Sequence, residues 1–312
     1  MSGRVITVTC NPSIDKTITV EKLQPYGLNR VLSSRLDPGG KGINVAKVLK
    51  SFGADVSVTG FIAGRQGELL SDFLNKSEIS FDFQEIPGET RTNIKLVDLS
   101  VNKTTEINES GCFVDSFALA QFREKFGQLM TQASIVVLSG SLPPGVPADF
   151  YAQCIHVARE NGVKAILDAD GEALIKGMEE TPFAVKPNIQ ELEAFCGHRL
   201  SGTGEVVEAA RELINRGVEI VIVSMGPDGA VVVDKDAAYK TDAWNIRVQS
   251  TVGAGDSMVG ALASSILKGS SLYDIAKLTT ASGTVTASKA GTEICTLREV
   301  LDSLSSVKVT NI

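Results

Sequence analysis

The chain has 312 residues, of which 43% are hydrophobic, and its formal net charge is −7. This length suffices for one large domain or for two modest ones. A nucleic-acid-binding domain ordinarily presents a basic surface, so the acidic balance argues against that class of protein. Small anionic ligands stay compatible with it, because they need only a few local cations and backbone amides.

The cysteines and the apolar runs indicate where the protein works. Five scattered cysteines form no CxxC pair, and neither histidine has a metal-ligand spacing. An odd, scattered set is typical of reduced thiols in the cytosol. The first apolar run is too short for a secretory signal, and no run is long enough to span a bilayer. We therefore expect a soluble, cytoplasmic protein with neither a nucleic-acid nor a membrane partner.

The chain opens with a predicted strand over Val5–Cys10 and then departs from a simple α/β rhythm. Residues 14–36 and 92–109 alternate polar and apolar positions over strand-like lengths, without intervening helices. They predict a small antiparallel β-sheet with one apolar face. Such a sheet needs a cover, so we expect it to close over a ligand or to pack against a second subunit.

A glycine-rich segment, Gly39–Ala46, follows the first of these regions. Its glycines and Lys41 precede an amphipathic helical pattern, so amides at the helix start could approach a ligand closely. The pattern is not a Walker A loop. A plain glycine turn entering a helix explains it about equally well. Asn44 is a poor interior helix former, and its place in the first turn favours a binding role.

From residue 56 onward, short apolar runs alternate with amphipathic stretches such as Ala148–Asn161 and Glu205–Arg216. This alternation predicts an α/β fold with a mostly parallel sheet sandwiched by helices. A hairpin near residues 229–239 would add antiparallel strands. The predicted strands are Val56–Phe61, Ile135–Ser139, Ala165–Asp168, Phe183–Lys186, Ile220–Ser224 and Ala230–Val233.

Polar residues stand at the carboxyl ends of several of these strands, and open α/β sheets bind ligands at those ends. Ser139–Gly145 and Ser224–Gly229 follow two strands, although both are also ordinary turns. Asn188 and Glu191 follow another strand three positions apart. Their spacing favours a helix capping box, and their oxygens also suit Mg²⁺.

The segment Gly253-Ala254-Gly255-Asp256 stands before a helix that is apolar nearly all round. Asp256 could simply favour the helix dipole. Yet the glycines leave backbone N–H groups free to form an anion hole. A carboxylate beside an anion hole is what a kinase needs, because the base takes a hydroxyl proton while the amides stabilise the transferring phosphoryl group.

Taken together, these motifs resemble the PfkB/ribokinase family of carbohydrate kinases across nearly the whole chain. Gly39–Ala46 and Ser250–Ser257 look like the family's two signatures, and Asn188-x-x-Glu191 resembles its magnesium-organising motif. The resemblance implies one ribokinase-like domain over residues 1–312, a three-layer sandwich with a small antiparallel lid formed by segments 14–36 and 92–109. In many members this lid also forms a homodimer interface.

The resemblance also assigns roles to individual residues. It implies ATP and Mg²⁺ as cofactors, and a monovalent cation such as K⁺ at carbonyls near Ser250 and Val252 in some members. The catalytic set is Asp256 with Gly253, Ala254 and Gly255. The substrate set, which includes two arginines and a lysine for an existing phosphate, is Asp15, Arg30, Gly39, Gly40, Lys41, Asn44, Arg91 and Ser139. The nucleotide set is Lys186, Asn188, Ser224, Gly226, Gly229 and Ser282, with Asp242–Gln249 beside the adenosine and Glu191 ordering water on Mg²⁺.

Within the family, the segments Cys10–Asp15, Gly39–Lys50 and Thr90–Lys95 most resemble the sugar-phosphate kinases. The implied reaction is ATP-dependent phosphorylation of fructose 1-phosphate, and Lys41 favours this substrate over fructose 6-phosphate. Tagatose 6-phosphate remains an alternative. A phosphosugar or nucleotide sensor without turnover would not need Asp256. A dehydrogenase is disfavoured because no Gly-x-Gly-x-x-Gly follows the first strand.

Overall fold

The computed structural model describes residues 3–312, and in that range ten strands form the central sheet. Their spatial order is β14-β13-β12-β11-β10-β9-β8-β1-β4-β5. The strands from β11 to β5 in this order are parallel, and β12, β13 and β14 complete the other edge by antiparallel pairing. The strands are β1 (Arg4–Thr9), β4 (Val56–Ile62), β5 (Ser80–Glu85), β8 (Ala133–Ser139), β9 (Lys164–Asp168), β10 (Ala184–Val185), β11 (Ile220–Ser224), β12 (Ala230–Val233), β13 (Ala238–Asp242) and β14 (Lys308–Asn311).

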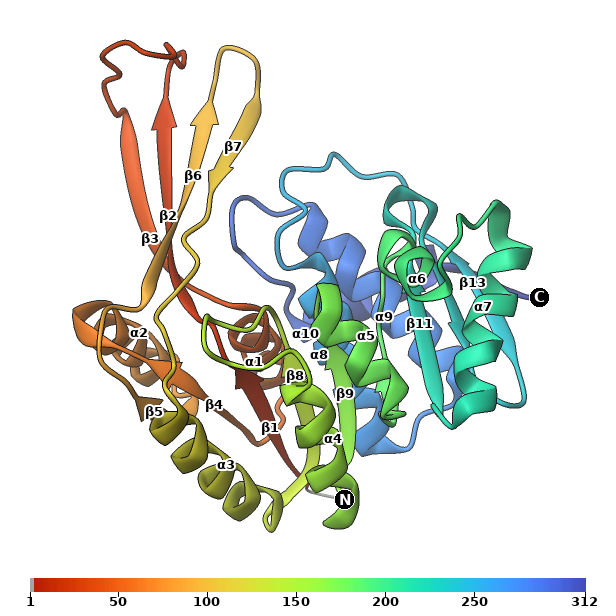
Figure 1. Ribbon diagram of the computed structural model, residues 1–312. Helices are drawn as coiled ribbons and strands as arrows, with labels where there is room; N and C mark the ends of the chain where they lie inside the picture. Colours follow the sequence, from red (N-terminus) through yellow and green to blue (C-terminus); the bar gives the residue numbers. More distant parts are fainter. Residues whose placement is uncertain (1–2) are drawn as a thin grey trace.

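Helices cover both faces of this sheet (Figure 1). One face carries α3 (Ser116–Met130), α4 (Phe150–Glu160), α5 (Gly171–Glu179), α6 (Ile189–Cys196) and α7 (Gly202–Arg216). The other carries α1 (Lys41–Ser51), α2 (Gly64–Lys76), α8 (Ala254–Lys268) and α9 (Leu272–Ala287). The short elements α10 (Leu297–Ser303), η1 (Gly226–Asp228) and η2 (Leu304–Ser306) complete the helical part.

The strand residues alternate between the two helical layers. In β11, Val221 and Val223 pack into the core beneath α3–α7, whereas Ile220 and Ile222 pack toward α1, α2, α8 and α9. Successive side chains of a strand point to opposite faces, so a strand buried on both sides needs apolar residues throughout. The continuous Ile-Val-Ile-Val run is thus the direct consequence of a sheet covered twice.

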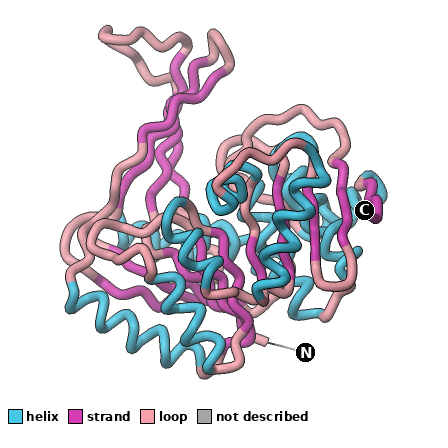
Figure 2. The backbone as a smooth tube through the Cα atoms, turned by 45° about the vertical axis from the view of Figure 1, so that its right-hand side comes forward, coloured by secondary structure: helices cyan, strands magenta, loops and turns pink. Residues whose placement is uncertain are grey.

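A separate sheet of four strands rises from the body as an arm, which we call the lid (Figures 1 and 2). Two antiparallel hairpins build it, and they join through a parallel pairing of β2 with β6. The two hairpins match the expected antiparallel sheet, and the parallel pairing at its centre is an addition that the sequence did not predict. The lid strands are β2 (Ser13–Val20), β3 (Ser33–Gly39), β6 (Arg91–Asp98) and β7 (Lys103–Ile107).

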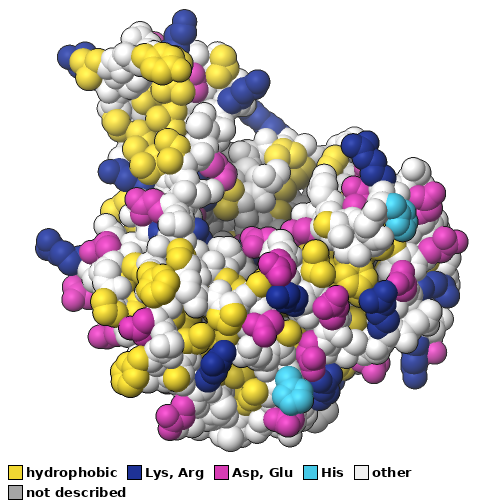
Figure 3. All heavy atoms as spheres, in the orientation of Figure 1, with side chains coloured by type: hydrophobic (Ala, Val, Ile, Leu, Met, Phe, Trp, Pro, Cys, Tyr) yellow, Lys and Arg dark blue, Asp and Glu magenta, His cyan; other side chains and the backbone are white. Residues whose placement is uncertain are grey.

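The register gives the lid two unlike faces. Leu36 and Ile94 both pair with Lys16 of the central strand β2, and Ile94 also pairs with Ile107. These paired side chains therefore lie in one row on the same face of the sheet. Leu36 and Ile107 are 42% and 56% exposed, so this apolar face is uncovered in the single chain. Figure 3 shows hydrophobic side chains gathered over the lid. Asp15 and Lys95 belong to the opposite, polar face.

Most predicted elements are confirmed, with shifted ends. The strand predicted over Phe183–Lys186 is reduced to β10, and an isolated bridge between Asn188 and Ser224 continues its pairing with β11 beyond Pro187. The edge strands β5 and β14 were missed, because their polar, exposed positions lack a buried-strand pattern. Among residues 3–312, no helix has the length and apolar character that crossing a membrane requires.

Candidate active site

A cleft of about 390 Å³ lies at the carboxyl ends of the parallel strands, beneath the lid. Its wall includes Asp168 and Ser224, the last residues of β9 and β11, and Lys186, which directly follows β10. The lid contributes Asp15, and the starts of α1 and α8 complete the enclosure. Strand ends that meet at one edge of a parallel sheet form the usual ligand crevice of this fold class.

The start of α1 brings the first glycine-rich motif to the cleft. Gly40 precedes the helix with φ 116°, a conformation that favours glycine. A Cβ there would lie 2.7 Å from Thr9 Cγ2, so the tight approach also requires glycine. Lys41 and Asn44 in the first turn then face the cleft. The interpretation as a glycine turn that begins a helix is confirmed, and the first turn of this helix also lines a ligand-sized space.

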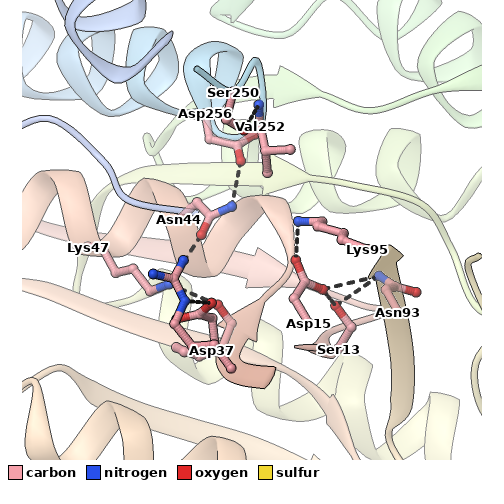
Figure 4. A network of polar contacts seen from close by, with 12 residues as sticks. Ser13, Asp15, Asp37, Asn44, Lys47, Asn93, Lys95, Ser250, Val252 and Asp256 are labelled. Atoms are coloured by element: carbon pink, nitrogen blue, oxygen red, sulfur yellow. Dashed lines mark hydrogen bonds and ion pairs between the residues drawn. The ribbon is translucent and has the colours of Figure 1, made fainter. Parts of the chain in front are cut away.

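The start of α8 brings Gly253 and Asp256 to the opposite wall. Gly253 has φ 77°, and its carbonyl accepts the first helical bond from Ser257. Within residues 3–312, the backbone amides of Gly255 and Asp256 donate no hydrogen bond to protein, which leaves them available to an anion. Asp256 is buried, and its Oδ2 accepts a 2.8 Å hydrogen bond from Asn44 Nδ2 (Figure 4). The two glycine-rich motifs therefore meet at this carboxylate.

Two lysines converge on the buried carboxylate of Asp168. Lys186 Nζ lies 3.2 Å from its Oδ1, and Lys41 Nζ lies 3.7 Å from the same atom. An added Cβ at Gly255 would be 3.4 Å from Lys186 Nζ, which places this cation beside the start of α8. The pair of cations is thus held between the two motifs, where an anionic ligand would enter.

The two carboxylates of the cleft have opposite pKa shifts. Burial, together with the nearby charge of Asp168, raises the pKa of Asp256 to about 6. The Asn44 hydrogen bond and the two lysines oppose this rise. Burial would also raise the pKa of Asp168, but Lys186 and Lys41 outweigh it and lower that pKa below its ordinary value. Environments that separate two carboxyl pKa values in this way are typical of acid–base assignments in enzymes, and Asp256 is the group suited to take a proton near neutral pH.

The polar face of the lid supplies a second charged cluster. Asp15 Oδ2 accepts a 2.7 Å hydrogen bond from Lys95, and its Oδ1 accepts from Ser13 and Asn93 at 2.8 and 3.3 Å (Figure 4). Arg91 starts β6 beside this cluster, and it donates to the backbone carbonyls of Asn11 and Glu109. The guanidinium is therefore fixed in place before any ligand binds.

Asn188 and Glu191 form a capping box at the start of α6. Asn188 Oδ1 accepts from the Glu191 amide at 2.9 Å, and Glu191 Oε2 accepts from the Asn188 amide at 2.8 Å. The capping interpretation is confirmed. Both side chains also line the cleft, so the structural role leaves room for a further one.

Several predicted residues do not line the cleft. Arg30 is exposed in the loop between β2 and β3 at the far end of the lid, and Ser282 is fully buried in α9 with its hydroxyl donating to the Leu278 carbonyl. The buried side chain of Ser282 has no surface to offer an adenosine. Ser139 is also fully buried. Three further residues fall outside the cleft lining, namely Gly226, Gly229 and Ala254, whereas Gly39 lies just behind it against Asp15.

Sequence reasoning missed four residues that the structure brings to the site. Asp168 was predicted only as a strand end, although a charged residue closing an apolar run was the available signal. Asn93 and Ser13 line the cleft from the lid, and Thr251 lines it from the segment before α8. The alternation in the lid strands separates a polar from an apolar face, but it does not show which polar side chains reach the cleft, so their role depended on the strand register.

Comparison with known proteins agrees with this geometry. Residues 8–299 match the pfkB family of carbohydrate kinases, and the chain belongs to that family. The family expected from the motifs is thereby confirmed.

Individual relatives narrow the class to kinases of sugar phosphates. The chain is 39% identical to the 1-phosphofructokinase of Xanthomonas campestris over 286 residues, covering 90% of each chain. It is 36% identical to the 1-phosphofructokinase of Bacillus subtilis over 308 residues, covering 99% of this chain and 100% of that one. A crystal structure of phosphofructokinase-2 from Escherichia coli in complex with potassium has a TM-score of 0.92 and 31% identity, covering 97% and 98% of the two chains. The same protein in its tetrameric inhibited form has a TM-score of 0.90 and 30% identity over the same shares.

Proposed function

We propose that this chain transfers the γ-phosphoryl group of ATP to the free primary hydroxyl of fructose 1-phosphate, giving ADP and fructose 1,6-bisphosphate. The observation that carries the proposal is a buried carboxylate, Asp256, beside free amides and two lysines in one cleft. The names of the curated relatives favour fructose 1-phosphate as the acceptor.

In the proposed reaction, Asp256 accepts the proton of the attacking hydroxyl as the oxygen–phosphorus bond forms and the bond to ADP breaks. Its elevated pKa suits proton transfer near neutral pH. The amides of Gly255 and Asp256 stabilise charge on the transferring group. Lys186, beside Gly255, serves the nucleotide phosphates.

The acceptor's own phosphate needs a cationic site away from Asp256. Arg91 and Lys41 line the cleft on the lid side and at the start of α1, and we assign this phosphate to them. Asp15, Asn44 and Gly40 are assigned to the sugar hydroxyls. Arg30 and Ser282 are left out of the site of the single chain, because neither lines the cleft.

Mg²⁺ fits the donors present at the nucleotide end. Among residues 3–312, no group of three or more histidine, cysteine or acidic side chains could hold a metal by itself. Mg²⁺ usually keeps several waters and binds through one or two carboxylates and substrate phosphates. Glu191 and Asn188 would hold such an ion through water, and the ion would neutralise charge on the ATP phosphates. A K⁺ site near Ser250 and Val252 remains a prediction.

A homodimer through the lid completes the proposal. The apolar face with Leu36, Ile94 and Ile107 is uncovered in the single chain. A second lid laid against it would remove this surface from water, and burial of apolar surface is the main favourable term in association.

A coupled assay with ATP, Mg²⁺ and one phosphosugar at a time tests the proposed substrate. We expect the highest kcat/KM with fructose 1-phosphate. A higher value with tagatose 6-phosphate or fructose 6-phosphate would reassign the substrate while keeping the reaction class. Absence of turnover with all three would contradict the proposal.

A further inference from the structure

Lys47 lies one helical turn after Asn44 on α1. It contacts Asn44, which in turn contacts Asp256. Its Nζ lies 3.3 Å from Asn44 Oδ1, and Asn44 Nδ2 lies 2.8 Å from Asp256 Oδ2 (Figure 4). Residues three apart on a helix share a face, so the sequence alone places Lys47 and Asn44 side by side. A row of three side chains therefore runs from Lys47 to Asp256.

The chemistry of the two outer groups determines the orientation of the amide between them. An ionised carboxylate only accepts hydrogen bonds, and an ammonium group only donates them. Asn44 carries a donor and an acceptor on one planar group, and only one of its two flipped orientations satisfies both neighbours. The reverse orientation would set its oxygen against the carboxylate of Asp256 and its NH₂ against the ammonium of Lys47.

We propose that Lys47 is a positioning residue that holds the Asn44 amide in the one orientation that donates to Asp256. This role rests on the proposed function of Asp256 as the base. Lys47 does not line the cleft, and its contact with the predicted sugar site is through Asn44 alone. It acts through Asn44.

A second contact fixes Lys47 itself. Its Nζ donates a 2.8 Å hydrogen bond to the carbonyl of Pro38, the next-to-last residue of β3. The ammonium is thus held at two points, and it cannot swing away from Asn44 without losing the Pro38 bond. The row of contacts is anchored at its outer end to the lid strand β3.

The charges around this row keep the lysine suited to its role. Burial lowers the pKa of Lys47 to about 8, while Asp37, Asp15 and Asp256 oppose this and Lys95 adds to it. The group therefore stays mainly protonated at neutral pH. A neutral amine would also retain N–H donors, so Asn44 keeps its orientation through this titration.

The groups facing Asp256 make its titration a direct readout. Asn44, Lys41 and Lys186 lower the pKa of Asp256, against burial and the charge of Asp168. Loss of Lys47 removes the charge that it places near Asp256 and also removes the fixed Asn44 donor, and both changes raise the pKa of Asp256. The pKa of Asp256 should therefore rise above about 6 when Lys47 is removed.

The test is Lys47→Met, which keeps most of the unbranched side chain and removes the donor. We expect kcat with fructose 1-phosphate to fall on the order of 10- to 100-fold, with a smaller change in KM. The pKa of Asp256, measured by ¹³C NMR of the labelled carboxyl in the ligand-free protein, should rise. Lys47→Arg restores a donor and should recover most of kcat and the original pKa.

Lys50→Met is the matched control, because Lys50 lies on the same helix, is exposed and pairs with the exposed Glu78 at 3.7 Å. It should leave kcat and the pKa of Asp256 unchanged. In an Asn44→Ala background, Lys47→Met should have little further effect on kcat, since residues that act through one another are not additive.

The outcomes separate the positioning role from the proposed reaction. An unchanged kcat and pKa in Lys47→Met would overturn the role of Lys47, and so would a loss of kcat that is fully additive with Asn44→Ala. A changed KM alone would assign Lys47 to holding the Pro38 segment instead and would equally overturn its positioning role.

Failure of the wild-type protein to turn over fructose 1-phosphate would count against the proposed function. The NMR measurement of the Asp256 pKa would still decide whether Lys47 positions Asn44. If Lys47→Met does not fold, Lys47→Leu takes its place in each measurement, since it also has no hydrogen-bond donor.

Discussion

Asn44 and Asp256 are separated by 212 positions in the sequence, yet Asn44 Nδ2 lies 2.8 Å from Asp256 Oδ2. The contact joins the first turn of α1 to the first turn of α8, and both turns follow glycines with positive φ. Each motif alone had an ordinary structural explanation. In the fold, both motifs contribute to the surroundings of one buried carboxylate, that of Asp256.

Replacing Asp256 by asparagine should abolish most of the turnover and leave nucleotide binding nearly intact. Loss of a general base costs about 10²- to 10⁴-fold in rate, whereas the nucleotide contacts assigned to Lys186 and Ser224 remain. Steady-state kinetics together with calorimetric titration of ATP would check both parts. Near-normal kcat in Asp256→Asn would remove Asp256 from the role of base.

The same substitution should stabilise the fold at pH 8. Folding raises the pKa of Asp256 to about 6. The folded protein therefore favours the neutral carboxyl, and the stability that this gives is fully present below the pKa of Asp256 in the unfolded chain and is lost as pH rises through about 6. Removing the buried charge therefore raises the free energy of unfolding, by at most about 3 kcal/mol. Denaturant unfolding at pH 8 and at pH 4 checks this, because the gain should nearly vanish at pH 4, where the carboxyl is neutral in the folded protein.

The rate should depend on pH with an acidic limb set by Asp256. The base must be ionised to accept a proton, and burial raises its pKa to about 6. We expect kcat/KM to fall about tenfold for each pH unit below that value. A limb near the ordinary aspartate value of about 4 would show that another group, or a solvated carboxylate, takes the proton.

Arg91→Ala should mainly weaken the binding of the sugar phosphate. Hydrogen bonds to a charged group contribute about 1.5–3 kcal/mol, which corresponds to roughly 10- to 100-fold in KM. Because Arg91 also holds the carbonyls of Asn11 and Glu109, thermal unfolding of the variant must accompany the kinetics. An unchanged KM for fructose 1-phosphate would exclude Arg91 from the phosphate site.

Ile107→Asp should convert the proposed dimer into monomers. The substitution places a charge on the apolar face of the lid, where it would be buried without a partner in a dimer. Thr104→Asp is the matched control, since Thr104 is exposed on the same strand and points to the opposite face. Sedimentation velocity distinguishes the two. A wild-type protein that sediments as a monomer would contradict the lid interface.

The fold could be predicted well wherever a strand is buried on both faces, as in Ile220–Val223, because such a strand must be apolar throughout. The edge strands β5 and β14 were not predicted, because their polar residues are exposed to solvent and so lack the apolar pattern of a buried strand. At the site, Asp256 was recognisable from its local motif. Asp168 and Lys47 were not, since their roles depend on which side chains the fold brings against them rather than on their neighbours in sequence.

The lid has a mechanical property that follows from where its strands begin and end. Strand β2 carries Asp15, β6 begins at Arg91, and β3 runs directly into the glycines before α1. The proposed sugar contact Asp15 is adjacent to Lys16, whose row holds Leu36, Ile94 and Ile107, so the sugar contact and the uncovered apolar row lie back to back on opposite faces of the arm. A second subunit packed against the apolar face would therefore restrain the strand that carries Asp15, and substrate affinity would then vary with protein concentration.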